Sequence, residues 1–407
     1  MRRRYNSAMP ADAIPLSRIR RVLVTKLRHH GDVLLASPVF TALKAAAPQV
    51  QIDGLVYADT AEMLSGHPDL SELHVIDRSW KRLGLMGQGK AEWSLLKTLQ
   101  SRQYDLIIHL TEHPRGAWLS RLLKPRYAVA PRVSGRGRFW KGSFSHFVPS
   151  IMGSGRRHVV EQNLDALRRL GVQPAHDKRA LTFVPGADAE AHIAVRLQAL
   201  GLEPGKFVHL HPPSRWHFKC WTAEGWAEII ARIRAAGWPV LLTAAPGDKE
   251  GHLIERIQTA LAQRSEPPAA SLAGALSLKE LGALTAQARL FAGVDSAPMH
   301  IAAAMRTPVV VLFGPSGEGH WGPWGTPRLG AHQVITQSTQ FNCRPCGLDG
   351  CGGGKVSECL TSIRPDEVWA AIQPLLKDYR STCRISVQVR SVAPVALPTK
   401  CAVAVRA

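Results

Sequence analysis

Short apolar runs rich in β-branched residues alternate with longer helical patterns along this chain, and the alternation restarts in its second half. Residues 21–27 and 105–110 are expected strands of the first series, and 207–211 and 308–313 of the second. Strands that are apolar on both sides are typical of parallel sheets covered by helices on both faces. The pattern therefore predicts an α/β protein with two Rossmann-like domains. Further strands are expected at 52–57, 73–76, 127–130, 240–243 and 290–294, and helices at 33–47, 93–101 and 223–236.

The chain of 407 residues is long enough for both domains, which we place at 18–180 and 181–380. Polar or small residues at 1–17 and 381–407 predict a flexible segment at each end. No stretch approaches the ~18 consecutive apolar residues of a membrane span, and the arginines near the N-terminus are not followed by the apolar core of a secretory signal. We therefore expect the protein in the cytoplasm, where thiols are reduced.

The charge of the chain points to anionic partners. Its 51 Lys and Arg residues exceed its 31 Asp and Glu residues by 20, and residues 1–180 hold most of the excess, with 29 basic and 14 acidic side chains. Such a charge suits nucleic acid, an anionic membrane or a phosphorylated substrate, but no RNP-type aromatic signature supports nucleic acid. Between 114 and 160 there are ten basic residues and no acidic one, which favours an anion-facing surface over a merely solvated one. The ten are Arg115, Arg121, Lys124, Arg126, Arg132, Arg136, Arg138, Lys141, Arg156 and Arg157.

The first candidate site is the loop after the opening strand, residues 26–35 with the sequence KLRHHGDVLL. Gly31 suits a tight turn, and a helix is expected to begin just after Asp32. Two interpretations of Asp32 stay open: a helix N-cap that accepts backbone N–H bonds, or a general base in a cleft between the domains. Ligands bind at the carboxyl ends of parallel strands, so this loop faces the expected cleft. The basic side chains expected beside Asp32 are Lys26, Arg28, His29 and His30.

Two loops of the second half are candidates for anion binding. In 290–300, a strand runs into a helix through Asp295, Ser296 and Ala297, and the first N–H groups of that helix suit a phosphate. Asp295 can cap this helix or hold a sugar hydroxyl, and His300 follows one turn later. In 211–221, Lys219 is a candidate partner for a diphosphate, and the alternative is an ordinary solvated lysine.

Four cysteines within 17 residues, with the spacing Cys-x2-Cys-x4-Cys-x7-Cys, raise the question of a metal site. The spacing matches neither a zinc ribbon nor a zinc finger, so unligated thiols or a fortuitous disulfide are favoured over zinc. A Walker A sequence, a Gly-x-Gly-x-x-Gly after the first strand, His-Glu-x-x-His and Gly-x-Ser-x-Gly are all absent. The four cysteines are Cys343, Cys346, Cys351 and Cys359.

Taken together, these loops resemble one family. The segment 26–35, the Lys219-Cys-Trp sequence, the Pro-Gly-Asp turn at 246–248 and the sequence GVDSAPMH at 293–300 resemble the ADP-heptose:lipopolysaccharide heptosyltransferases, glycosyltransferase family 9. The double histidine and the cysteine segment are most similar to the heptosyltransferase III branch. The resemblance covers about 18–375. It implies a GT-B fold, with the two domains facing each other across a cleft, and an inverting transfer without metal or another cofactor. The implied donor is ADP-L-glycero-β-D-manno-heptose, bound mainly by the second domain, and the implied acceptor is a heptose of the lipopolysaccharide inner core, bound by the first.

The resemblance also implies roles for single residues. Asp32 matches the proposed catalytic base, Lys219 a diphosphate-binding lysine and Asp295 a contact of the donor heptose. Ser296 and Ala297 match a phosphate-cradling turn that often reads Thr-Gly in the family. Further donor-side positions are Ser214 near the phosphates, Asp248 or Glu250 near the ribose, Leu276 near the adenine, and His300.

The basic first half would then face a phosphorylated glycolipid in the cytoplasmic leaflet of the inner membrane, with the protein attached peripherally. Two rival interpretations stay open: another GT-B enzyme, such as an epimerase or a transferase with a different donor, and a non-enzymatic polyanion-binding protein. The residues expected on the acceptor or anion side are Lys26, Arg28, His29, His30, Arg115, Arg132, Arg136 and Arg138.

Overall fold

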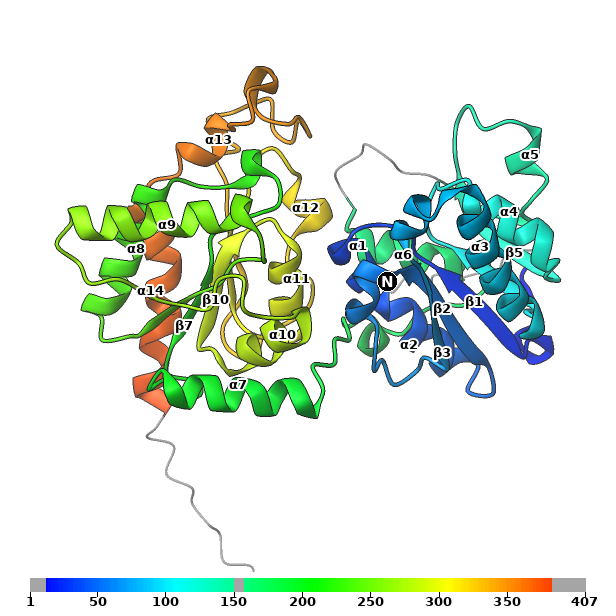
Figure 1. Cartoon of the computed structure of the whole chain (residues 1–407), viewed down its shortest axis with the longest axis horizontal. Helices are drawn as coiled ribbons and strands as arrows, with labels where there is room; N and C mark the ends of the chain where they lie inside the picture. Colours follow the sequence, from blue (N-terminus) through cyan, green and yellow to red (C-terminus); the bar gives the residue numbers. More distant parts are fainter. Residues whose placement is uncertain (1–11, 150–156, 383–407) are drawn as a thin grey trace, which may run out of the picture.

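Two parallel six-stranded sheets form the protein (Figure 1). The computed structural model describes residues 12–149 and 157–382. The first sheet has the order β3-β2-β1-β4-β5-β6 and the second β12-β11-β10-β7-β8-β9. Every strand pair is parallel, and in each sheet the order reverses direction beside the first strand, as in a Rossmann fold. Two Rossmann-like domains, as the alternation predicts, therefore build the chain.

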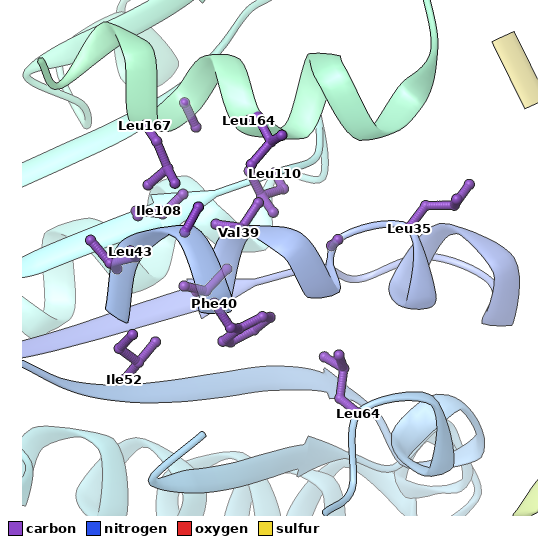
Figure 2. Close-up of a cluster of buried hydrophobic side chains, with 14 of the residues drawn as sticks. Leu35, Val39, Phe40, Leu43, Ile52, Leu64, Ile108, Leu110, Leu164 and Leu167 are labelled. Carbon is purple, nitrogen blue, oxygen red and sulfur yellow. The ribbon is translucent and has the colours of Figure 1, made fainter. Parts of the chain in front are cut away.

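In the first domain the strands are apolar because helices cover both faces. Strand β1 is buried from Val22 to Thr25 and pairs with β2 and β4, so it lies in the middle of the sheet. Figure 2 shows α2 and α6 next to each other, with Ile108 of β4 drawn between them, and the buried side chains of the two helices belong to one core cluster. The elements are η1 Leu16–Arg18, β1 Arg21–Thr25, α1 His30–Leu34, α2 Ser37–Ala46, β2 Gln51–Tyr57, η2 Ala58–Met63, β3 Glu72–Ile76, η3 Arg78–Arg82, α3 Gly84–Ser101, β4 Leu106–His109, α4 Arg115–Leu123, β5 Tyr127–Arg132, α5 Arg138–Lys141, β6 His146–Pro149 and α6 Val159–Arg169.

The second domain repeats this arrangement around the buried strands β7 and β10. The last helix, α14, packs against α8, β11 and β12, so it belongs to this domain. No helix of the described part of the chain is both long enough and apolar enough to cross a membrane. The elements are η4 His176–Lys178, α7 Ala187–Ala199, β7 Val208–His211, η5 His217–Lys219, α8 Ala223–Ala235, β8 Val240–Leu242, α9 Asp248–Gln263, β9 Ala270–Ser271, α10 Leu278–Gln287, β10 Leu290–Val294, α11 Ala297–Ala304, β11 Val309–Leu312, α12 Glu318–Trp321, β12 Gln333–Ile335, η6 Cys351–Gly353, α13 Glu358–Thr361 and α14 Pro365–Thr382.

Part of the N-terminal segment that was expected to be flexible is packed against the first domain. From Asp12 onward the N-terminal segment is packed: Ile14 is buried and donates its backbone N–H to the carbonyl of Leu170, 3.2 Å away. Asp12 forms a two-pronged ion pair with Arg169 at 2.7 and 2.6 Å. The expected flexible segment 1–17 is therefore wrong for 12–17, while 1–11 and 383–407 lie outside the described residues. The expected domain boundary at 180 falls in the connection between α6 and α7.

The two domains touch along the ends of their strands. Helix α1 lies against α11, and α6 lies beside α12 (Figure 1). His158 Nε2, in the first domain, is 2.9 Å from the carbonyl oxygen of Gly322, and its ring stacks on Trp324. Lys279 of α10 donates a 2.7 Å hydrogen bond to the carbonyl of Ser65. These contacts leave the strand-to-helix loops of both sheets facing each other, which is the cleft of a GT-B fold.

Candidate active site

Asp32 lies in the first turn of α1, directly after β1. The N-cap of this helix is His29, whose side chain caps nothing, and α1 already begins at His30. The carboxylate of Asp32 forms no hydrogen bond with any described residue. The interpretation of Asp32 as an N-cap is therefore wrong, and the carboxylate is available for chemistry. Gly31 lies inside the helix, so the expected tight turn at Gly31 is wrong as well.

A cavity of about 280 Å³ opens beside Asp32 between the domains. Lys26, Arg28 and Glu112 line it from the first domain, and His320 and Trp321 of α12 line it from the second. Sequence reasoning missed α12, although the glycine- and tryptophan-rich segment that follows β11 was a possible signal.

Four basic side chains surround Asp32. Burial lowers the pKa of each of them, and the negative charge of Asp32 opposes that shift in all four. Asp32 is thus an acidic side chain that lies among basic ones. The four are Lys26, His29, His300 and His320.

The predicted basic residues of this loop have different surroundings. The buried ammonium of Lys26 donates to the carbonyl of Leu110 at 3.3 Å and to Asn163 Oδ1 at 3.0 Å. Arg28 is exposed at the wall of the cavity, and His29 is exposed next to it. The ring of His30 lies 2.7 Å from the carbonyl oxygen of Asp59. Arg28 is therefore the cation of the loop that an anionic ligand in the cavity meets first.

On the opposite side, Lys219 and Asp295 form an ion pair with an N–O distance of 2.5 Å. The pair joins the loops that follow β7 and β10, so two separate predicted positions come together at the carboxyl edge of the second sheet. Ser296 is the N-cap of α11, and its hydroxyl donates to the carbonyl of Val294 instead of capping the helix. Helix α11 begins at Ala297, two residues after Asp295, and the first N–H groups of a helix have no partner within it.

His300 lies where the two halves of the site meet. A Cβ atom on Gly31 would stand 2.8 Å from His300 Cδ2, so α1 and α11 approach each other closely at this point. His300 is 3% exposed, and its Nδ1 has no hydrogen-bond partner among the described residues. Burial lowers the pKa of His300 to about 4, so the ring is neutral at physiological pH. A buried neutral imidazole with an unpaired nitrogen indicates a position that a ligand completes.

The other predicted donor-side residues lie on loops at the same edge of the sheet. Glu250 accepts the backbone N–H of Ala245 at 2.9 Å, and burial raises its pKa. Ser214 accepts the N–H of Trp216 at 3.3 Å, Asp248 is exposed at the first turn of α9, and Leu276 is half-buried against the core. The contacts in the structure thus bring Lys219 to Asp295 and place Glu250 3.8 Å from His211 Nε2 of β7, whereas the Ser214 hydroxyl bonds within its own loop.

Some basic residues of the segment 115–157 form ion pairs with acidic residues from other parts of the chain. Arg115 forms a bidentate ion pair with Glu92 of α3 at 2.5 and 2.8 Å, and Arg157 pairs with Asp165 of α6. Because these acids come from outside the segment, counting along the sequence could not show the pairs. The expectation of ten anion-facing cations is wrong for these two, and Arg156 lies outside the described residues.

Three other predicted cations of the segment lie near aromatic rings or on a short helix. Arg136 donates to the carbonyl of Glu112 at 2.9 Å and lies over the ring of Trp140. Arg132 lies over the ring of Phe147, and Arg138 is the first residue of α5. Arg132 and Arg136 therefore each lie next to an aromatic ring of the first domain.

The cysteine segment contains free thiols. Cys343, Cys346 and Cys351 are exposed, and Cys359 is buried. Burial raises the pKa of Cys359, and its three neighbours in the segment add to the shift. Among the described residues, potential metal ligands within 4.8 Å of one another occur at a different place, in the cluster Asp53, Glu72 and His74.

That cluster is an internal ion network of the first domain. Burial alone would raise the pKa of Asp53, but hydrogen bonds with His74, Arg102 and Tyr104 lower it to about 2. The Arg102 guanidinium binds both carboxylate oxygens of Asp53 at 2.8 and 3.0 Å, and the Tyr104 hydroxyl donates at 2.7 Å. A guanidinium in this position repels a second cation, so the cluster stabilises the fold and is a poor site for a metal. An aspartate inside the apolar strand 51–57 was the sequence signal for it.

The carboxylate of Asp32 lies on one Rossmann-like domain, and Lys219 and the N-terminus of α11 lie on the other. This arrangement is that of a glycosyltransferase of the GT-B class. The sequence comparisons refine this class. Residues 92–352 match the model of glycosyltransferase family 9 (heptosyltransferase). The lipopolysaccharide heptosyltransferase 3 of Escherichia coli K12 is 36% identical over 299 residues, which are 73% of this chain and 83% of that protein. The chain belongs to glycosyltransferase family 9.

Solved structures share the fold over nearly the whole chain. A glycosyltransferase family 9 protein from Veillonella parvula superposes with a TM-score of 0.74 at 21% identity, covering 90% of this chain and all of that one. The ADP-heptose lipopolysaccharide heptosyltransferase II of Escherichia coli gives a TM-score of 0.68 at 19% identity, with 88% and 99% covered. The predicted GT-B fold is thereby confirmed.

Proposed function

We propose that this enzyme transfers L-glycero-D-manno-heptose from ADP-heptose to a heptose of the lipopolysaccharide inner core, with inversion at the anomeric carbon. The observation that carries the proposal is the opposition of Asp32 to the Lys219–Asp295 pair across the contact between α1 and α11. The similarity to lipopolysaccharide heptosyltransferase 3 and to a structure named for ADP-heptose supports the choice of sugar and acceptor.

In this mechanism Asp32 accepts the proton of the acceptor hydroxyl as its oxygen attacks the anomeric carbon. The bond from that carbon to the diphosphate oxygen breaks on the opposite face, and ADP leaves with the bonding electrons. Inversion requires base and leaving group on opposite sides of the sugar, and Asp32 and Lys219 come from opposite domains. The acceptor would occupy the cavity beside Asp32, where Arg28 meets its anionic groups.

The negative charge that develops on ADP needs positive partners. The ammonium of Lys219 has three donors, so it can bind a phosphate oxygen while it keeps its contact with Asp295. The free N–H at the start of α11 adds a second donor together with the helix dipole. This pair of groups performs the neutralisation that a divalent cation performs in other transferases, and the chain has no Asp-x-Asp sequence to hold one.

His300 is the third group that we place at the transferred sugar. It is neutral, because burial lowers its pKa to about 4, its Nδ1 is unpaired, and it is close enough to Asp32, Asp295 and Lys219 for their charges to act on its ring. A neutral imidazole can exchange one hydrogen bond with a hydroxyl of the sugar. Asp295, which is 5% exposed, supplies an acceptor for a second hydroxyl.

The test is the release of ADP from ADP-heptose in the presence of lipopolysaccharide acceptors truncated at defined core heptoses. We expect release with an acceptor that carries the inner-core heptoses, no turnover of UDP-sugars, and an α-linked product from the β-configured donor. Turnover of a UDP-sugar would assign the enzyme to a different donor, and epimerised nucleotide sugar without transfer would replace the transferase by an epimerase. Because the acceptor is anchored in a bilayer, the proposal places the enzyme at the cytoplasmic face of the inner membrane.

A further inference from the structure

An apolar groove of about 580 Å³ runs between α3 and α4 of the first domain. Leucines of α3 line it together with Trp93 and Trp118. Helices α4 and α5 lie on the part of this domain that faces away from the second domain (Figure 1). The groove is therefore separate from the contact between the domains.

Several large apolar side chains are unusually exposed in this groove, in the turn of α3 that precedes its lining residues Gln88 and Gly89, and at Phe139, whose ring contacts Trp118. Leu85 and Met86, at the start of α3, are each 91% exposed, and Trp93 and Trp118 are more than half exposed. Single exposed apolar residues are ordinary, but a gathered set marks an interaction surface. We call this set the α3–α4 face: Leu83, Leu85, Met86, Trp93, Trp118, Leu122 and Phe139.

Basic side chains lie beside aromatic residues of the α3–α4 face. Residues 78–149 hold 14 Lys and Arg residues against three Asp and Glu residues, and of these cations Arg78, Arg102 and Arg115 are paired with Asp59, Asp53 and Glu92. Lys97 lies over the ring of Trp93 at 5.6 Å, and Arg121 lies over the ring of Phe139 at 4.6 Å. Aromatic rings beside cations are typical of surfaces that lie at the boundary between lipid headgroups and acyl chains.

The positive charge near the α3–α4 face distinguishes between two possible binding partners, a second copy of the chain and an anionic bilayer. A second copy of the chain would bring the same positive face against itself, and like charges would repel. An anionic bilayer attracts the cations, by about 1 kcal/mol for each one near its surface, and accepts the apolar side chains at shallow depth. The α3–α4 face therefore fits a membrane better than it fits its own copy.

The face also leads into the active-site cavity. The loop between β4 and α4 has two sides: Leu110, Thr111 and Glu112 line the cavity beside Asp32, and His113 and Pro114 line the groove. Burial lowers the pKa of His113, and four cations add to the shift, which places them around this loop. The four are Arg115, Arg28, Arg136 and Lys81.

We propose that the α3–α4 face inserts into the headgroup region of an anionic bilayer and so turns the mouth of the Asp32 cavity toward lipid-anchored acceptors. The identity of the acceptor rests on the proposed function, but binding to the bilayer does not. Leu85 and Met86 enter the bilayer furthest, since they are the most exposed. The cations around the face contact lipid phosphates.

The experiment is co-sedimentation of the full chain with vesicles of phosphatidylcholine alone, or of phosphatidylcholine and phosphatidylglycerol in equal parts. We expect binding to the anionic vesicles that weakens with salt, and a blue shift of tryptophan emission as Trp93 and Trp118 leave water. The Leu85→Ser/Met86→Ser double variant should need at least about tenfold more anionic lipid for half-binding, because two apolar side chains no longer leave water. Val195→Ser/Leu348→Ser, which replaces exposed apolar residues of the second domain, should bind like the wild type.

Transfer assays separate this proposal from the proposed function. The Leu85→Ser/Met86→Ser variant should keep wild-type turnover on a deacylated, water-soluble core acceptor and lose it on acceptor embedded in vesicles. Equal vesicle binding by this variant and the wild type, or no preference for anionic lipid, would overturn the membrane proposal. A concentration-dependent dimer that the variant abolishes, without vesicle binding, would make the face a protein interface instead. Vesicle binding without heptose transfer would refute the proposed function and leave the membrane face intact.

Discussion

Replacement of Asp32 by asparagine tests the proposed general base most directly. The asparagine side chain would keep the size of the native one but could not accept the proton of the acceptor hydroxyl. Loss of a positioned base slows a reaction by about 10²–10⁴-fold, which corresponds to about 3–5 kcal/mol in the activation free energy. Because the carboxylate of Asp32 has no hydrogen-bond partner within 12–149 and 157–382, this loss should come without a large change in the free energy of unfolding.

The assay measures the kcat of ADP release at saturating donor and acceptor, with ADP affinity from calorimetry and Tm from thermal unfolding. We expect kcat to fall by two to four orders of magnitude, while ADP affinity and Tm stay near the wild-type values. Asp69→Asn is the matched control, since Asp69 is also half-buried in the first domain but lies outside the cavity. Asp32→Asn with a near-normal kcat would refute the role of Asp32, and a parallel loss of ADP affinity would make it a binding residue.

Three further substitutions test other parts of the argument. Lys219→Ala should weaken ADP binding about 10–100-fold in calorimetry, because a charged hydrogen bond to phosphate is lost, whereas Lys355→Ala on the exposed cysteine segment should not. Gly31→Ala should raise helix propensity but reduce transfer about tenfold or more, because its Cβ would lie 2.8 Å from His300 Cδ2; unchanged kcat would show that the two helices separate freely. Asp53→Asn should lower the free energy of unfolding by about 2 kcal/mol at neutral pH, the equivalent of a pKa lowered from 3.8 to about 2. Because this folded-state pKa is depressed, the stabilisation is present above about pH 4 and is lost as the pH falls toward 2, so acid titrations of the two proteins should converge there.

The fold was predictable where strands are buried on both faces. Central strands such as β1, β4, β7 and β10 have continuous apolar sequences, because helices cover them on both sides. The three strands that the sequence pattern missed, β6, β9 and β12, all lie at sheet edges. Their sequences HFVP, AS and QVI are short and partly polar, so no periodic pattern marks them. The expected single helix 33–47 is two helices, α1 and α2, separated at Leu35 and Ala36.

The residues of the candidate site that lie in loops directly after strands could be predicted from the sequence. Asp32, Lys219 and Asp295 follow β1, β7 and β10, and the parallel topology places these loops on facing edges. Their side-chain partners were not predictable, because a partner can come from any helix that packs nearby. Arg115 shows this limit, since its acidic partner Glu92 lies on α3 and removes it from the set of free cations.

Gly31 shows most clearly why a sequence pattern and a structural cause can differ. The loop sequence suggested a glycine required by a turn, but Gly31 lies within α1 and does not have a positive φ angle. What excludes a side chain is His300, which lies 269 positions later in the chain and on the other domain. A glycine at this position lets the helix that carries Asp32 approach the helix that begins beside Asp295. His300 is buried at this close approach, and burial lowers the pKa of its imidazole to about 4. The absence of a side chain at Gly31 therefore allows the two halves of the site to come together at His300.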